Sequence, residues 1–187
     1  MYNSLVAGNL IIAPPSLTST NFAKSVIMLL GRQPTLGFVL NKPSNILISS
    51  IFQDIPASMD DNIFWGGSEN TNTVWILHTK DWRMYNTTDI TDEWCVTSNI
   101  DMFSIIAKYT QPMYWRVFVG CTIWKTGQLE LEIEQIDVDT ASQGWMIAPT
   151  QSAEFIMDCS YSDLWYHCIN ESTKFAIRNM FSEHNNP

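Results

Sequence analysis

Residues 114–135, "YWRVFVGCTIWKTGQLELEIEQ", decide the fold. The first seven, 114–120, are rich in aromatic and β-branched side chains, which is typical of a central β-strand. Residues 124–135 fit two patterns. A period of two places three glutamates on one face of a strand, whereas a period of 3.6 places Leu129 and Ile133 on one face of a helix. Leu, Glu and Gln form helices more readily than strands, so we predict that a helix begins here.

Outward from this stretch, short apolar runs are interspersed with amphipathic segments. The apolar runs predict strands at residues 9–13, 25–30, 36–41, 62–67, 73–79, 93–97, 145–149 and 154–158, with a Gly66-Gly67 turn and polar residues 68–72 between two of them. The amphipathic segments predict helices at residues 44–54, at 99–109 behind a Ser98 cap, and at 162–181 behind a Ser162 cap. Because no regular βαβ repeat connects these elements, we expect an α+β architecture.

The composition indicates one folded domain. The chain has 187 residues, of which 45% are hydrophobic and 16% charged, and its 8 Trp and 9 Phe supply core volume. A domain of this length buries roughly 70% of the surface of its unfolded chain. We expect one domain over residues 1–182 and a frayed tail over 183–187.

The charge and the length of the apolar runs bear on partners and location. A net charge of −9 opposes binding to phosphate backbones, so direct nucleic-acid binding is disfavoured. No apolar run reaches the roughly 18 residues of a membrane-spanning helix, and no basic segment precedes the apolar N-terminal residues. We therefore expect no membrane contact and place the protein in the cytoplasm.

The four cysteines do not have the spacing of a metal or redox site. Cys95, Cys121, Cys159 and Cys168 form no C-x-x-C pair, and no histidines lie at zinc-ligand spacing around them. Free cysteines in a reducing compartment behave as small apolar side chains. We predict a packing role for all four, and neither a metal ion nor a cofactor.

A few polar residues lie where chemistry is conceivable. Ser25 and His78 would form a nucleophile and base only if the sheet brought them together. No G-x-S-x-G elbow supports that role, so a hydrogen-bonded serine and a satisfied histidine are the simpler interpretation. Asn41, followed by Lys42 and Pro43, suits a turn better than ligand recognition, and Gly66-Gly67 suits a tight turn better than an anion site.

The predicted helix after Trp124 offers a second set of candidates. Glu130 and Glu134 would lie together at a spacing of four, as a like-charge pair that a divalent ion or acid–base chemistry could use. No matching His or Asp cluster accompanies them, so a solvated helix surface is the simpler interpretation. Trp124 is expected to anchor the helix in the core, and Gln128 to bridge to neighbouring strand ends.

Several of these segments occur in the order found in a known family. They are "GNLIIAPPSL", "FAKSVIMLL", "LGFVLNKPS", "WGG", "WILH" and "VGCTIWKTGQLELEI", followed by Trp145 and Trp165. Together they resemble the AlgH/YqgE family of small bacterial proteins over nearly the whole chain. The resemblance implies a mixed, partly barrel-like sheet flanked by helices, and a helix that begins at "GQLELEI". This chain departs from the family pattern at Ser68-Glu69, at 121–123, and at 135–144, which look inserted.

The family is generally described as transcriptional regulators, without an agreed biochemical activity. Our leading hypothesis is therefore a non-enzymatic regulatory or adaptor protein that acts through protein contacts, with a surface formed by Asn41, Lys42, Gly67, Trp124, Gln128 and Glu130. Affinity capture from the host, repeated after substitution of Gln128 and Glu130, tests it. The rival hypothesis is a small-molecule binding protein or hydrolase-like enzyme, with a pocket near Ser25, Asn41, His78 and Glu130. A deep pocket with convergent polar groups would favour the rival class.

Overall fold

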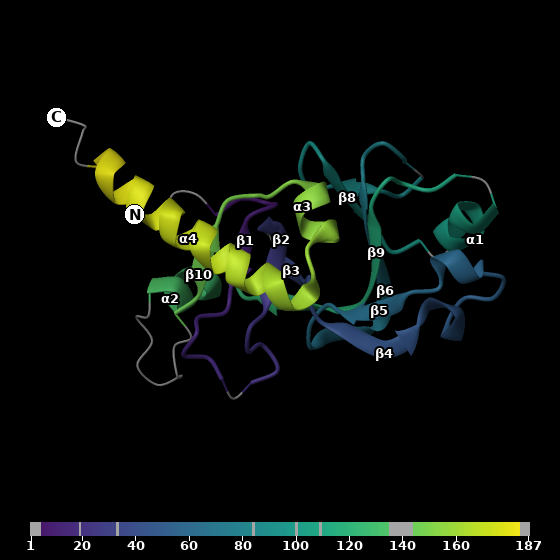
Figure 1. Ribbon diagram of the computed structural model, residues 1–187, viewed down its shortest axis with the longest axis horizontal. Coiled ribbons are helices and arrows are strands. Elements are labelled where there is room, and N and C mark those ends of the chain that lie inside the picture. Colours follow the sequence, from purple (N-terminus) through teal and green to yellow (C-terminus); the bar gives the residue numbers. More distant parts are fainter. Residues whose placement is uncertain are drawn as a thin grey trace.

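A strongly curled β-sheet forms the body of the molecule in the computed structural model (Figure 1). The structure describes residues 5–18, 20–32, 34–83, 85–99, 101–108, 110–134 and 144–183. Over these residues, ten strands join in one sheet. Its main path runs through β10 (Met146–Ala148), β1 (Leu10–Ile12), β2 (Val26–Arg32), β3 (Thr35–Val39), β9 (Trp115–Trp124), β6 (Glu69–Thr79), β8 (Trp94–Thr97) and β7 (Thr88–Asp89). A branch consists of β5 (Asn62–Trp65), parallel to β9, and β4 (Pro43–Leu47), antiparallel to β5.

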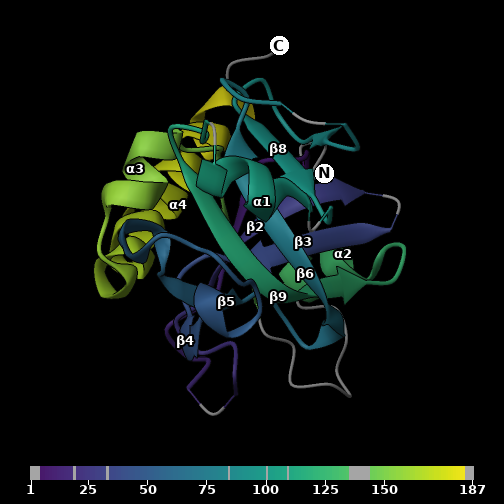
Figure 2. The ribbon, with the colours of Figure 1, turned by 90° about the vertical axis from the view of Figure 1, so that its right-hand side faces the viewer.

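Helices flank this sheet, as Figure 2 shows from the end. They are α1 (Asp101–Lys108), α2 (Gln128–Glu134), α3 (Ala153–Asp158) and α4 (Tyr161–Glu183), and two 3-10 turns cover Ile48–Ser50 and Ala57–Met59. α3 and α4 lie on the same side of the sheet, where α4 packs on β10, β1 and β2. The α+β architecture with a mixed, half-barrel sheet is confirmed.

The central strands are buried on both faces, which explains their continuous apolar sequences. In β2, Val26 and Met28 face the cluster that contains residues of α3 and α4, whereas Ile27 and Leu29 face the cluster that contains Leu129 of α2. The same alternation governs β9. Phe118 belongs to the α3–α4 side and Val117 to a third cluster beneath α1. The side chain of Arg116, two residues before Phe118, therefore lies on the α3–α4 side.

The helix predicted after Trp124 is confirmed. α2 begins at Gln128, after Gly127 has taken a φ of +79°, a conformation that favours glycine. The segment at 135–144 that looks inserted lies outside the described residues, except for Gly144.

The helix predicted over residues 44–54 is wrong. Its first part is β4, which pairs with β5 through Pro43 opposite Phe64 and Leu47 opposite Asn62. One 3-10 turn follows, and it buries Ile48. The Ser and Ile residues that suggested a capped helix suit an edge strand equally well, because β-branched side chains favour extended backbone.

The strand predicted over 154–158 is also wrong, because α3 occupies these residues. Its N-terminus is capped twice: Ser152 Oγ accepts from Phe155 N at 3.2 Å, and Glu93 Oε1 accepts from Ala153 N at 3.0 Å. The second cap comes from a residue sixty positions away, which local sequence patterns do not show. Two satisfied backbone donors favour the helix over a short strand.

The caps of the other helices lie beside the predicted residues. Asn99 rather than Ser98 accepts from Asp101 N, and Ser160 rather than Ser162 accepts from Asp163 N. The polar residues from Glu69 onward, predicted as a turn, are the start of β6 and pair with β9 from Glu69 opposite Cys121.

The outer half of α4 departs from its predicted apolar face. Leu164 and Cys168 are buried, but Ile177 is 47% and Phe181 69% exposed. The helix extends past the sheet at this end, so its last turns leave the core (Figure 1). No helix among the described residues combines the length and apolar character needed to cross a bilayer.

Candidate binding cleft around Arg116

The turn after β3 is held by Asn41. Its Oδ1 accepts from Val26 N at 3.0 Å, and its Nδ2 donates to Lys24 O at 2.8 Å and Tyr161 O at 3.3 Å. Lys42 Nζ donates to Asn21 O, and partial burial lowers the pKa of Lys42. Both side chains thus fix neighbouring loops, in keeping with the turn interpretation.

The motif around Trp124 converges on a glutamate that the sequence did not single out. Glu132 Oε2 accepts from the indole nitrogens of Trp124 at 3.0 Å and Trp145 at 2.8 Å. Its Oε1 accepts from Gln128 Nε2 at 2.7 Å, while Gln128 Oε1 accepts from Lys125 N. Gln128 and Glu132 are one helical turn apart, so α2 presents both to the end of β9.

The predicted contact residues are spread along the sheet. Thr35, at the start of β3, pairs with Trp124, and Asn41 follows six residues later, up to about 20 Å away along an extended chain. Gly67 lies between them against β9, where a Cβ atom would come within 2.3 Å of the Cys121 backbone. Glu130 is half-buried on α2. The protein-contact surface stays a prediction, but its residues do not form one compact patch.

Ser25 and His78 are both buried and lie in different parts of the sheet. β3 and β9 separate β2 from β6, so about 14 Å of sheet lies between the two side chains, beyond the reach of a nucleophile and its base. His78 Nδ1 bonds Thr79 O at 2.9 Å, and burial lowers the pKa of His78. Among the described residues, Ser25 Oγ and His78 Nε2 have no hydrogen-bond partner, contrary to the prediction that both are satisfied.

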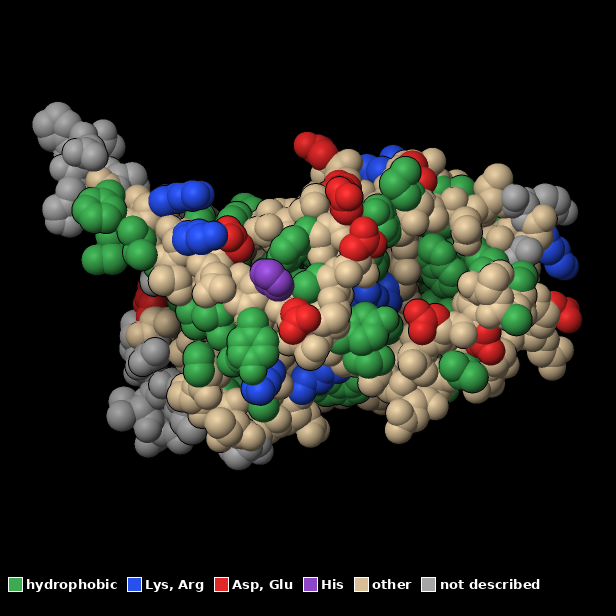
Figure 3. Space-filling view, viewed as in Figure 1, with side chains coloured by type: hydrophobic (Ala, Val, Ile, Leu, Met, Phe, Trp, Pro, Cys, Tyr) green, Lys and Arg blue, Asp and Glu red, His purple; other side chains and the backbone are tan. Residues whose placement is uncertain are grey.

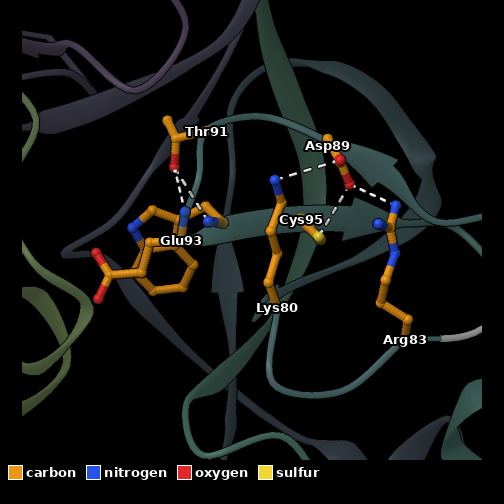
Figure 4. A network of polar contacts seen from close by, with 7 residues as sticks. Lys80, Arg83, Asp89, Thr91, Glu93 and Cys95 are labelled. Atoms are coloured by element: carbon orange, nitrogen blue, oxygen red, sulfur yellow. Dashed lines mark hydrogen bonds and ion pairs between the residues drawn. The ribbon is translucent and has the colours of Figure 1, made fainter.

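Cys95 belongs to a polar network at the β7–β8 end (Figure 4). Its thiol donates to Asp89 Oδ1 at 3.4 Å, and Asp89 also pairs with Lys80 at 3.2 Å and Arg83 at 2.6 Å. Burial and the neighbouring carboxylate raise the pKa of Cys95 to about 11. The thiol is therefore protonated near neutral pH, which does not suit a nucleophile.

A cleft of about 290 Å³ opens between the α3–α4 connection and strands β5 and β9. Residues from four segments line it: Met59 before β5, Phe64 in β5, Arg116 in β9 and Tyr161 at the start of α4. Figure 3 shows this face, with a basic group recessed near its centre and acidic groups around it.

Arg116 is the basic side chain that lines this cleft. Only 7% of the residue is exposed, and its Nη1 donates to Leu40 O at 2.8 Å. The guanidinium carbon lies 4.3 Å from the centre of the Phe64 ring and 5.3 Å from that of Tyr161. Guanidinium carries five N–H donors, and the bond to Leu40 is the hydrogen bond that it forms within the described residues.

Two carboxylates stand at the exposed rim of the cleft. Asp61 precedes β5 and Asp158 ends α3. Asp61 partly offsets the effect of burial, which lowers the pKa of Arg116. Burial and the nearby Asp158 raise the pKa of Tyr114, also in the lining. Neither carboxylate comes within ion-pair distance of Arg116 in the described chain, so the guanidinium has no counter-ion of its own.

A buried guanidinium with free donors is suited to a planar oxyanion. Two parallel N–H···O bonds to a carboxylate satisfy a guanidinium edge, and the pair is strong where water is excluded. The Phe64 and Tyr161 rings pack against the guanidinium and restrict its movement, so little side-chain entropy is lost on binding. Within the described residues, no three His, Cys, Asp or Glu side chains gather closely enough to hold a metal ion.

Arg116 was not among the residues predicted from sequence. It stands in "YWRVFVG", where every neighbour is apolar, and the strand pattern dominated the interpretation. A lone arginine inside a strand buried on both faces is unusual, because charged side chains are almost never fully buried without a partner. The lone arginine was therefore a signal of a site in the sequence itself. The nature of the site depends on Phe64 and Tyr161, which are distant in sequence.

Comparison with known proteins fixes the family. Residues 10–174 match the model of the AlgH-like family, DUF179. The protein belongs to the AlgH-like family. Among its AlgH-like relatives are UPF0301 proteins of Chromobacterium violaceum, 26% identical over 82% of each chain, and of Pasteurella multocida, 28% identical over 83% of this chain and 84% of the relative. The AlgH/YqgE assignment made from the sequence is confirmed.

Solved structures of two similar proteins share the fold. The solution structure of AlgH from Pseudomonas aeruginosa has a TM-score of 0.70 at 23% identity, and covers 88% of this chain and 87% of its own. The crystal structure of the Corynebacterium diphtheriae protein DIP2367 has a TM-score of 0.67 at 23% identity, with coverage of 87% and 85%. At this identity the likeness establishes the AlgH-like fold alone.

Proposed function

We propose that this AlgH-like protein is a non-catalytic, ligand-binding regulator whose cleft around Arg116 takes a small organic carboxylate. The observation that carries the proposal is a guanidinium that is 7% exposed, holds one backbone hydrogen bond and faces a cleft of about 290 Å³. Burial of a charge without a partner is costly, so a bound anion would repay part of that cost.

The side chains that could do chemistry argue against a catalytic role. Cys95 and Cys168 are buried thiols whose pKa values are raised to about 11 and about 12, mainly by burial. Ser25 lies across about 14 Å of sheet from His78, beyond the reach of a nucleophile and its base. A ligand that binds and leaves unchanged fits these residues better than a substrate does.

The position of the cleft supports a regulatory use. Tyr161 and Asp158 belong to the connection between α3 and α4, so a ligand at Arg116 would contact the segment that sets the start of the longest helix. The protein-contact role predicted from the sequence is compatible with this reading, because ligand occupancy could bias a surface that α3 or α4 presents.

Binding of carboxylates tests the proposal. A panel of small mono- and dicarboxylates and amino acids should yield a ligand by calorimetry on the wild-type protein. Arg116→Lys keeps the charge but loses the paired donors, so we expect affinity to fall at least tenfold, about 1.4 kcal/mol. Arg178→Gln, an exposed arginine on α4, is the matched control and should bind normally.

Folding of the variants is checked separately. Arg116→Lys should retain the circular-dichroism spectrum and a cooperative thermal transition, so that loss of binding reports the site. If no carboxylate in the panel binds the wild-type protein, or if Arg116→Lys binds as tightly as wild type, the proposed function is wrong.

A further inference from the structure

The charges that line the cleft restrict its ligand more than Arg116 alone does. Arg116 lies at the floor, whereas Asp61 and Asp158 stand exposed at the rim. A simple anion that approaches the floor is repelled by both rim carboxylates, and the whole chain carries a net charge of −9. A ligand with a positive group beside its carboxylate is attracted both by Arg116 at the floor and by the two carboxylates at the rim.

The two rim carboxylates are available to a cation. Asp61 accepts from the backbone of Asn62 through Oδ1 at 2.7 Å, and its other oxygen forms no ion pair within the described residues. Asp158 interacts with the Tyr114 hydroxyl through its charge and a hydrogen bond, and that hydroxyl is a neutral group. Neither carboxylate forms an ion pair with a described Lys or Arg. An ammonium group has three donors, enough to use both oxygens of one carboxylate or one oxygen of each.

Part of the remaining wall is apolar and adaptable, beside polar side chains such as that of Asn62. Met59, Met113 and Met157 line the cleft, together with the buried side chain of Ile48. Methionine is unbranched and polarizable, so it fits apolar groups of varied shape. The lining thus places a cation at the floor, two carboxylates at the rim, and flexible methionines among polar side chains in the wall.

We propose that the ligand is a small zwitterion, an amino acid with an apolar side chain, whose carboxylate binds Arg116 while its ammonium group binds Asp158 and Asp61. This inference rests on the proposed function, since it names the ligand class of the same cleft. It assigns Asp158 and Asp61 as specificity-determining residues, because they distinguish an amino acid from the corresponding plain carboxylic acid.

Matched ligand pairs test the inference. Leucine, methionine and phenylalanine are each compared by calorimetry with the analogue that lacks the amine, for example leucine with 4-methylpentanoate. At least one amino acid should bind the wild-type protein tenfold or more tightly than its analogue. In Asp61→Asn/Asp158→Asn this preference should fall below about threefold, through weaker amino-acid binding and tighter binding of the analogue. Glu134→Gln, at the exposed end of α2, is the control and should keep the full preference.

The outcomes separate this inference from the proposed function. If the analogues bind as tightly as the amino acids, with binding still lost in Arg116→Lys, the zwitterion is refuted and a carboxylate-binding cleft stands. If the amino acids are preferred but the double variant keeps that preference, Asp61 and Asp158 are not its cause and the inference is overturned. If neither class binds the folded wild-type protein, both proposals fail.

Discussion

Glu132 is the residue of α2 on which three side chains converge. One carboxylate accepts from two indoles and one amide, and the indoles belong to Trp124 and Trp145, which are 3% and 5% exposed. Trp124 closes β9 and Trp145 precedes β10, so Glu132 ties α2 to two strands of the sheet. Its role is to satisfy buried donors, and it makes the end of the half-barrel one cooperative unit.

Removing this carboxylate should destabilise the fold. Glu132→Ala leaves two buried indole N–H groups without an acceptor, so we expect the free energy of unfolding to fall by about 2–4 kcal/mol. Glu132→Gln keeps one oxygen acceptor and should cost less. Urea unfolding followed by fluorescence measures both. Glu134→Ala, at the exposed end of the same helix, should stay within about 0.5 kcal/mol of wild type, and an equal loss in both variants would contradict the assigned role.

Single residues were the hardest feature to predict from the sequence. The spacing of Glu130 and Glu134 drew attention to that pair, yet the carboxylate between them is the one that binds three side chains. Helical spacing relates Glu132 to Gln128, but the two indoles reach it through the folding of the sheet. Arg116 shows the same limit, because its aromatic neighbours come from β5 and α4.

At the scale of elements, periodicity identified most strands and helices, and hydrogen bonds from distant segments decided the failures. The strand predicted at 154–158 became α3 because Ser152 and Glu93 cap its first turn. The helix predicted at 44–54 became β4 because β5 offers it a pairing edge. In both cases a distant segment supplied the deciding hydrogen bonds, so the local pattern could not reveal them.

The start of α4 gives a test at this scale. Ser160 Oγ accepts from Asp163 N at 3.2 Å and donates to Asp163 Oδ2 at 2.6 Å, a reciprocal cap. Ser160→Ala should therefore lower the free energy of unfolding by about 1 kcal/mol. Ser162→Ala removes the residue that the sequence suggested as cap and should change stability by less than about 0.5 kcal/mol. Denaturant titration of the two variants side by side would reveal a reversed order if the cap were misassigned.

At the scale of the whole molecule, the family resemblance predicted more of the fold than the residue patterns did. Composition and periodicity indicated one α+β domain, but not that β5 lies parallel to β9 or that α4 covers β10, β1 and β2. Strand order depends on contacts between distant segments, and many orders are compatible with the same apolar runs. The cleft at Arg116 depends on that strand order.

The buried thiols give the whole fold a dependence on alkaline pH. The pKa of Cys95 is raised to about 11 and that of Cys168 to about 12, against 9.0 for an unperturbed thiol. Above pH 9 the unfolded chain loses thiol protons that the folded chain keeps, so this contribution to stability is complete below pH 9 and declines toward pH 11–12.

Urea unfolding at pH about 7 and about 10 measures this decline. Cys168→Ala should show a smaller loss between the two pH values than wild type, whatever its stability at neutral pH. Burial lowers the pKa of Lys42, so Lys42 makes the free energy of unfolding rise with pH. This effect is the same in wild type and Cys168→Ala, so it cancels when their pH slopes are compared. An identical slope in the two proteins would show that Cys168 does not contribute.

The main path of the half-barrel sheet ends in two edge strands, whereas β4 is the edge of the branch. One end, β10, lies under α4. The other, β7, is two exposed residues long, and its Asp89 is paired with Lys80 and Arg83. Short, charged or covered edges deny a neighbouring molecule a row of backbone groups on which to add its own strand. A second copy of the chain therefore finds little backbone to pair with at either end of the main path.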